Sequence, residues 1–336
     1  MTNNLSSIKF AMKRGREGMS RMVMLAAVAF VGMIGVAFAA PAGIGTSAAG
    51  SIYHSSGSAV AKVAIEKAGF PATIVPFASP NVWIPSLNAG ELQFGLANLY
   101  ETTLAYEGKE YFSGRPTKNL RAVGIMYPLR TGLFVRKDSP IKKIADLKGR
   151  PVPAGYTSQK TILPLLEAAY ATAGLTHDDM KPVQVPTVIG GADALISGKA
   201  EMFLFALGSA KVQEADAAVG GIRTLSIDNT PANLAAVRKH FPVGYLRLEN
   251  PGPKNPGVAG PSYVIAYDGL VVASSATPDD MVYKLTKAMY ENKADLAASF
   301  AVFNFFEPQE MAKDIPYPYH PGAIKFYKEK GMWPPK

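Results

Sequence analysis

Hydrophobic positions along the chain switch between a two-residue and a helical spacing, which predicts alternating strands and helices. Apolar runs at residues 72–78 (ATIVPFA) and 92–98 (LQFGLAN) are typical of buried strands. Residues 58–68, between a serine-rich turn and the first run, carry helical periodicity and stop at a glycine. Residues 81–90 predict a short helix that also ends at a glycine. Helix, strand, helix and strand therefore follow one another.

The same order recurs in the second half of the chain. Residues 120–140 predict two strands interrupted near Pro128, and residues 161–175 predict a helix. The segment GADALISGKAEMFLFALG repeats the helix, glycine and strand order of IPSLNAGELQFGLAN. This alternation favours an α/β fold with two parallel sheets, helices on both faces, and a ligand cleft beyond the carboxyl ends of the strands. The loops expected at the cleft are residues 53–58, 98–101, 155–161 and 205–209.

Residues 1–39 predict a cleaved export signal. Five basic residues precede an apolar run at residues 22–39, and Ala37-Phe38-Ala39 offers the small-x-small pattern of a signal-peptidase site. An uncleaved membrane anchor is the alternative, because the run is close to the shortest length that spans a bilayer. We expect the mature chain to be exported.

Composition and charge exclude several classes of function. The chain has no Cys, which excludes thiol catalysis and Cys-ligated metal sites, and its four His form no H-E-x-x-H pattern. The net charge is +9 for the whole chain and falls to +5 without residues 1–39, which carry five basic residues and one acid. No long Lys/Arg block is present, so nucleic-acid binding is not expected. A modest positive charge suits an anionic small molecule better.

Several segments together carry a family resemblance. They include GSIYHSSGSAVAKV, LNAGELQFGLAN, LRAVGIMYP, ALISGKAEMFLFALGSA, YDGLVVASSATPDDMVYKLTKAMYEN and YPYHPGAIKFYKEKGMW. Their order and spacing resemble the TAXI family of TRAP-transporter solute-binding proteins over residues 50–333. The match has departures: the second strand ends in Asn98-Leu99-Tyr100 where a Gln-Ser-Asp-like tripeptide is common, and the middle loop YTSQKT keeps only Thr161 of a Gly-Ser-Gly-Thr cradle.

The resemblance implies a type II periplasmic binding protein fold with one solute held between two lobes. Each lobe would have a central sheet flanked by helices, and crossing hinge strands would join them. Lobe 1 is expected at residues 44–133 and 272–336, and lobe 2 at residues 134–271. The implied protein is a periplasmic monomer without a cofactor or metal. It would deliver a small organic acid to a TRAP transporter membrane subunit, expected to be a fused one.

The expected ligand is a carboxylate. A helix N-terminus beside the serines would supply partial positive charge and N–H donors, and Lys160 or Arg130 would supply a full charge across the cleft. Tyr53, Tyr100 and Phe205 would pack against the carbon skeleton. The expected ligand-binding residues are Tyr53, His54, Ser55, Ser56, Ser58, Asn98, Tyr100, Arg130, Thr157, Ser158, Lys160, Thr161, Phe205, Gly208 and Ser209.

Structural alternatives exist for each feature. The serines can simply cap the helix, His54 can be a surface or packing residue, and Arg130 can pair with an acid outside the cleft. The aromatic residues can belong to the core.

An exported two-lobed α/β enzyme, such as a transferase or lyase acting on a small anion, is the alternative function. It would need a base or nucleophile with a placed partner, and the sequence has neither a G-x-S-x-G motif nor a phosphate-binding loop. Residues 43–48 match a loosened dinucleotide fingerprint, G-x-G-x-x-A, but that motif requires a preceding strand. No catalytic residue is therefore assigned.

Overall fold

The computed structural model describes residues 40–252 and 255–335. The predicted export signal, residues 1–39, lies outside the described residues. Within the described residues, no helix combines the length and the hydrophobicity that a membrane crossing requires.

A mixed sheet of eight strands organises the chain, in the order β2-β1-β3-β10-β4-β7, with β8 beside β4 and β9 beside β10. β1 pairs in parallel with β2 and β3, whereas β4 and β10 pair antiparallel with each other and with the other strands beside them. A separate parallel pair joins β5 to β6. The strands are β1 (Ala42–Ser47), β2 (Ala72–Phe77), β3 (Phe94–Asn98), β4 (Leu120–Arg136), β5 (Pro151–Gly155), β6 (Lys181–Val185), β7 (Met202–Ala206), β8 (Ile222–Leu225), β9 (Tyr245–Glu249) and β10 (Ser262–Ser274).

The helices cover this sheet and the smaller pair. They are α2 (Ile52–Val63), α3 (Pro80–Asn88), α4 (Leu99–Glu107), α5 (Ile162–Ala171), α6 (Val188–Ile196), α7 (Ala210–Ala218), α8 (Pro231–His240), α9 (Asp279–Glu291), α10 (Lys293–Ser299) and α11 (Pro321–Glu329). The alternation of strands and helices predicted from the sequence is thus observed. Several elements were not predicted, among them the strand β1 and the helix α4.

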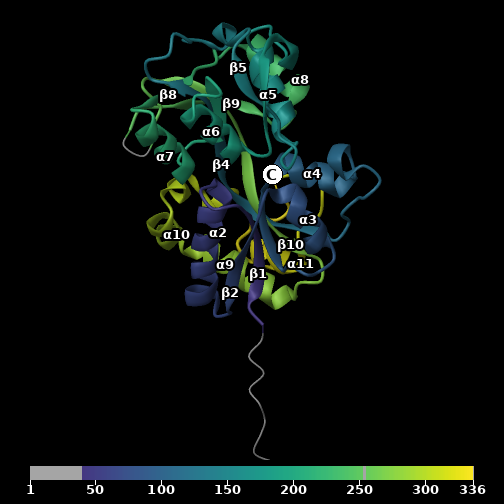
Figure 1. Cartoon of the computed structure of the whole chain (residues 1–336). Helices are drawn as coiled ribbons and strands as arrows, with labels where there is room; N and C mark the ends of the chain where they lie inside the picture. Colours follow the sequence, from purple (N-terminus) through teal and green to yellow (C-terminus); the bar gives the residue numbers. More distant parts are fainter. Residues whose placement is uncertain (1–39, 253–254, 336) are drawn as a thin grey trace, which may run out of the picture. The chain divides into compact units, whose positions relative to one another are not determined.

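Two long strands connect the two ends of the molecule. In Figure 1, β5, α5, α6, α7 and α8 lie at one end and β1, β2, α2, α9 and α11 at the other, while β4 and β10 run between them. The prediction of two separate parallel sheets is therefore wrong in detail, because β4 and β10 join both ends into one mixed sheet. The boundaries of the two lobes stay a prediction.

The interruption predicted near Pro128 is also wrong, since β4 is one strand of 17 residues. Pro128 pairs with Asp268 of β10, and β7 joins the other edge of β4 only from Thr131 onward. Proline lacks an N–H and is tolerated in a strand where one edge has no neighbouring strand. Here the free edge removes the need for that donor.

The first helix begins earlier than the periodicity predicts. Ser51 is the N-cap of α2, and its hydroxyl accepts a hydrogen bond from the N–H of His54 at 3.1 Å. The loop predicted at residues 53–58 is therefore wrong, because those residues form the first turns of α2. The start of the helix was placed too late because several nearby serines are all suitable N-cap residues, and the sequence does not show which of them is the cap.

The glycines of the dinucleotide-like stretch are strand residues of β1. Gly45 faces the fully buried Trp83, and a Cβ on Gly45 would lie only 2.8 Å from Cδ2 of that indole. Close packing in the core explains this glycine.

Candidate ligand-binding cavity

One cavity draws its walls from segments far apart in the chain. Its empty volume, which includes space open to solvent, is about 680 Å³. Apolar and aromatic side chains dominate the walls, with a few polar groups among them. The lining residues are Ser47, Ala48, Ser51, Ile52, Tyr53, Ala78, Asn98, Tyr100, Glu101, Leu129, Thr131, Gln159, Thr161, Ile162, Thr187, Val188, Ile189, Leu204, Phe205, Ala206, Phe241 and Tyr267.

Four helix N-termini meet at this cavity. The N-cap residues of α2, α4, α5 and α6 are Ser51, Asn98, Thr161 and Thr187, and all four line it. First-turn N–H groups have no partner inside their own helix, and each helix start carries roughly half a positive charge. The described lining residues include no Lys, Arg or His. Positive potential in the cavity therefore comes from backbone dipoles.

Glu101 is the one acidic side chain in the lining and is only 2% exposed. Its Oε2 accepts a hydrogen bond from Asn98 Nδ2, and its Oε1 accepts one from Thr161 Oγ1, both at 2.6 Å. Burial raises the pKa of Glu101 to about 7, although the bonds from Thr161 and Asn98 act in the opposite direction. The cavity therefore contains a carboxyl group that changes charge near neutral pH.

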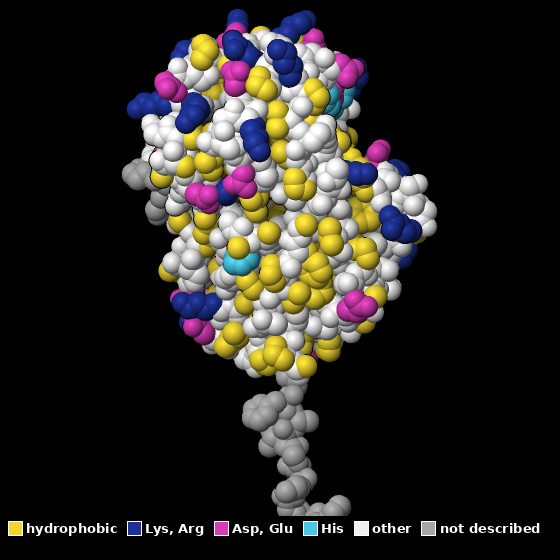
Figure 2. Space-filling view, viewed as in Figure 1, with side chains coloured by type: hydrophobic (Ala, Val, Ile, Leu, Met, Phe, Trp, Pro, Cys, Tyr) yellow, Lys and Arg dark blue, Asp and Glu magenta, His cyan; other side chains and the backbone are white. Residues whose placement is uncertain are grey.

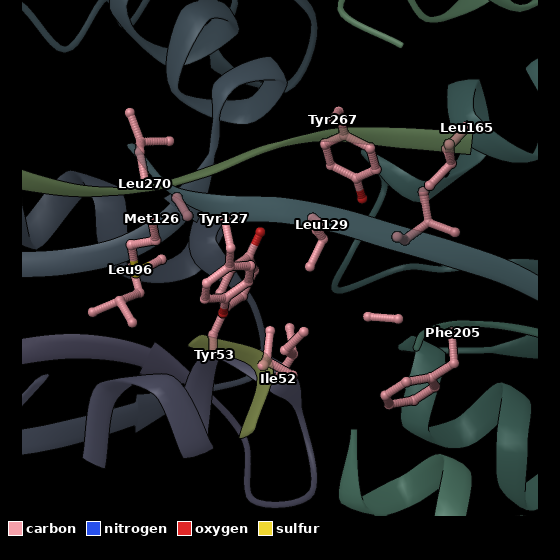
Figure 3. Close-up of a cluster of buried hydrophobic side chains, with 14 of the residues drawn as sticks. Ile52, Tyr53, Leu96, Met126, Tyr127, Leu129, Leu165, Phe205, Tyr267 and Leu270 are labelled. Atoms are coloured by element: carbon pink, nitrogen blue, oxygen red, sulfur yellow. The ribbon is translucent and has the colours of Figure 1, made fainter. Parts of the chain in front are cut away.

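Buried hydroxyl groups in and near the cavity differ in whether they have a hydrogen-bond partner within the protein. Within the described residues, Ser47 Oγ and Tyr53 Oη are buried without a hydrogen-bond partner. By contrast, Tyr127 Oη is hydrogen-bonded to Ser56 Oγ. Tyr53 and Tyr127 lie next to each other in Figure 3, so the two phenols form a natural comparison. Unsatisfied buried hydroxyls are costly, which makes Ser47 and Tyr53 candidates for contact with a ligand.

Aromatic rings form the remaining wall. Phe241 packs against Tyr100, with ring centroids 4.4 Å apart, and against Tyr267 at 4.8 Å. Figure 3 shows Tyr267, Leu129 and Phe205 around one open region, with the Tyr267 hydroxyl directed toward it. These side chains suit the carbon skeleton of a small solute.

Five of the fifteen predicted binding residues line this cavity, namely Tyr53, Asn98, Tyr100, Thr161 and Phe205. The other residues predicted in the first segment, His54, Ser55, Ser56 and Ser58, belong to α2 and do not line it. The Ser58 hydroxyl is exposed and donates to the His54 carbonyl at 3.0 Å.

Of the predicted middle loop, residues 155–161, only Gln159 and Thr161 line the cavity. Thr157 and Lys160 are exposed, and Ser158 is half-buried. Two side chains donate to backbone carbonyls of this loop. Ser79 Oγ, at the N-cap of α3, donates to the Ser158 carbonyl at 2.5 Å, and Tyr111 Oη, in the segment after α4, donates to the Lys160 carbonyl at 2.9 Å. The Lys160 ammonium lies 5.9 Å from the Tyr111 ring.

Arg130 lies on the opposite face of β4. Successive side chains of a strand point to opposite faces, and Leu129 and Thr131 line the cavity while Arg130 does not. Its Nη1 instead forms an ion pair with Glu249 at 2.7 Å. Pairing with an acid outside the cleft, the alternative considered for Arg130, is what the structure shows. Gly208 lies near Arg130, and neither Gly208 nor Ser209 lines the cavity.

Sequence reasoning did not select several cavity residues, including Glu101, Gln159, Thr187, Phe241 and Tyr267. For Glu101 a signal existed: an acid three residues after Asn98 has the spacing of a capping box. Thr187 similarly precedes a glycine-containing helix start. Phe241 and Tyr267 carry no local signal, because only the tertiary fold brings them to the cavity.

The charged surface is mixed. On the face shown in Figure 2, Lys and Arg side chains lie mostly on the upper part and at the margins, with Asp and Glu among them. Many of these charges form exposed pairs, such as Lys284 with Asp280 at 2.7 Å, and pairs of this kind contribute little to stability.

Comparisons with known proteins agree on the fold. A protein-family model described as the NMT1-like family matches residues 44–331. A solved structure described as a periplasmic transporter is 15% identical, with a TM-score of 0.55 over 88% of this chain and 94% of that one. MatC from Rhodopseudomonas palustris, with bound malate, is 14% identical, with a TM-score of 0.54 over 78% and 88% of the two chains. The predicted two-lobed α/β fold class is confirmed.

Proposed function

Since the chain belongs to the NMT1-like family, we propose that it is an extracytoplasmic solute receptor of a membrane transporter. The observation that carries the proposal is the cavity at which four helix N-termini meet. The cavity gathers residues from Ser47 to Tyr267, as expected for a binding protein that encloses one solute. The shared fold with a periplasmic transporter protein supports the same role.

The proposed solute is a small organic acid. Four helix starts, each with roughly half a positive charge, together exceed the single negative charge of an ionised Glu101. They would hold a carboxylate without a Lys or Arg partner, and Tyr53 and Ser47 would add hydroxyl donors. The malate bound by MatC, which has the same fold, is a carboxylic acid. Tyr100, Phe205 and Phe241 would cover the carbon skeleton.

The resemblance to the TAXI family supports a TRAP transporter as the receiving membrane subunit and the periplasm as the site of action. A receptor that delivers its solute to a transporter releases that solute chemically unchanged. An enzyme with the same fold would release a product instead. No specific observation favours the enzyme, because the one cavity carboxyl, Glu101, is held by Asn98 and Thr161.

A thermal-shift panel tests the proposed ligand class. It would compare small mono- and dicarboxylates with the corresponding amides, and mass spectrometry would then examine the recovered solute. The receptor predicts that acids raise the melting temperature, that amides do not, and that the solute is recovered unchanged. Equal shifts for acids and amides would refute the carboxylate, and a converted solute would refute the receptor.

A pair of tyrosine variants tests the position of the site. Tyr53→Phe removes a hydroxyl that has no partner among the described residues, so affinity should fall by about 0.5–1.5 kcal/mol while stability is retained. Tyr127→Phe is the matched control: it removes a hydroxyl bonded to Ser56 and should lower stability with little change in affinity. The reverse pattern would place the solute elsewhere.

A further inference from the structure

A second cavity lies on the other face of the hinge strand β4. Its walls combine Gly208 and Gln213, from the region after β7, with Asn255 and with Phe300 and Phe305 near the end of the chain. Arg130 forms one side of it and is only 2% exposed. The Arg130 cavity, as we name it, is thus separate from the candidate ligand-binding cavity described above.

Charge around Arg130 is not balanced. Glu249 is buried and accepts from Arg130 Nη1 at 2.7 Å and from Arg247 Nε at 3.1 Å. One carboxylate therefore neutralises two guanidinium groups, which leaves one excess positive charge. Asn255 Oδ1, at 3.4 Å from the same Nη1, adds a neutral acceptor.

One edge of the Arg130 guanidinium has no acceptor among the described residues. Nε is buried and unpartnered, and no hydrogen bond from Nη2 to a described residue is present. Nε and Nη2 form one side of the planar group, the fork that arginine uses to bind an oxyanion through two parallel hydrogen bonds. Gly208 lies beside this edge: a Cβ at this position would lie 3.7 Å from Nη2, an ordinary contact distance.

The ring of Phe305 lies over the face of the guanidinium, 3.9 Å from Cζ to the centroid, and fixes its plane. We propose that the Arg130 cavity is a second binding site, for a small oxyanion held by the Nε/Nη2 fork. A carboxylate with an aromatic or aliphatic body would also contact Phe300 and Phe305, whereas an inorganic oxyanion would use the fork alone. This site is independent of the solute bound in the first cavity.

Calorimetric titration with benzoate and with sulfate tests this site on the full chain. Saturable binding is expected, and tighter binding of benzoate than of sulfate would identify the organic acid as the preferred class. Arg130→Lys keeps a charge beside Glu249 but loses the fork, so affinity should fall at least about tenfold. Circular dichroism would confirm that this variant folds.

Two tryptophan variants separate the cavities. Ala301→Trp would fill the Arg130 cavity and leave Arg130 in place, so it should abolish the binding. Ala78→Trp would fill the first cavity and should leave the binding intact. The proposal is overturned if neither anion binds, or if the binding is undiminished in Ala301→Trp.

Discussion

Replacing Glu101 by Gln should stabilise the protein at alkaline pH and change little at acidic pH. Glutamine has the shape of the protonated carboxyl group, so its oxygen can still accept from Asn98 and its amide can donate to Thr161. The substitution therefore removes the buried charge and keeps both hydrogen-bond partners, with Thr161 accepting in place of donating.

The magnitude follows from the pKa. Burial raises the pKa of Glu101 from 4.5 to about 7 in the folded protein, and one pKa unit is worth about 1.4 kcal/mol, so the full effect is ~3 kcal/mol. The position of Glu101 in the first turn of α4 opposes the rise by only about 0.3–1 kcal/mol. Loss of hydration therefore dominates.

The sign follows from proton linkage. A carboxyl group whose folded pKa is raised binds its proton more tightly in the folded state than in the unfolded state. Its contribution to stability is complete below the unfolded pKa and is lost as the pH rises through the folded pKa. For Glu101 this window runs from 4.5 to about 7.

Urea unfolding of the wild type and of Glu101→Gln, at about pH 5 and about pH 8.5, measures the effect. The advantage of the variant should grow by roughly 2.5 kcal/mol between the two conditions, because about pH 5 already lies slightly above the unfolded pKa. Glu91→Gln, at an exposed position, is the control and should show no such growth. If the difference in the free energy of unfolding between wild type and Glu101→Gln is the same at both pH values, the raised pKa of Glu101 is refuted.

Three further predictions use the same structure. Above about pH 7 the affinity for an organic acid should fall as Glu101 ionises, and titration calorimetry should find this dependence absent in Glu101→Gln. Gly45→Ala should lower the free energy of unfolding by about 1–3 kcal/mol through overpacking against a buried indole, whereas Gly260→Ala, in open space, should not. Ser56→Ala should cost about 1–3 kcal/mol in urea unfolding, because it leaves a buried tyrosine unpaired, and Ser58→Ala, which is exposed, less than about 0.5.

The order of strands and helices could be predicted because hydrophobic spacing is a local property. The continuity of β4 could not, since it depends on the absence of a neighbouring strand beside Pro128, which is a property of the sheet. In the same way, the alternation of helix and strand favoured parallel sheets, whereas the long strands β4 and β10 pair antiparallel.

Candidate site residues were predictable where the signal was local and not where it required the tertiary fold. Asn98 and Thr161 stand at helix starts, and such positions can be recognised from sequence. Arg130 was misplaced relative to the cavity, because a strand alternates its faces and the sequence does not show which face is enclosed. Glu101 was overlooked as a ligand-binding residue although it follows Asn98 at cap spacing.

The most direct test of the receptor is native mass spectrometry with the tightest-binding acid of the panel. We predict one acid per chain, recovered chemically unchanged after prolonged incubation, and loss of the complex in Ala78→Trp, which would fill the cavity. A complex that persists in Ala78→Trp, or an acid recovered as a different compound, would contradict the proposed receptor.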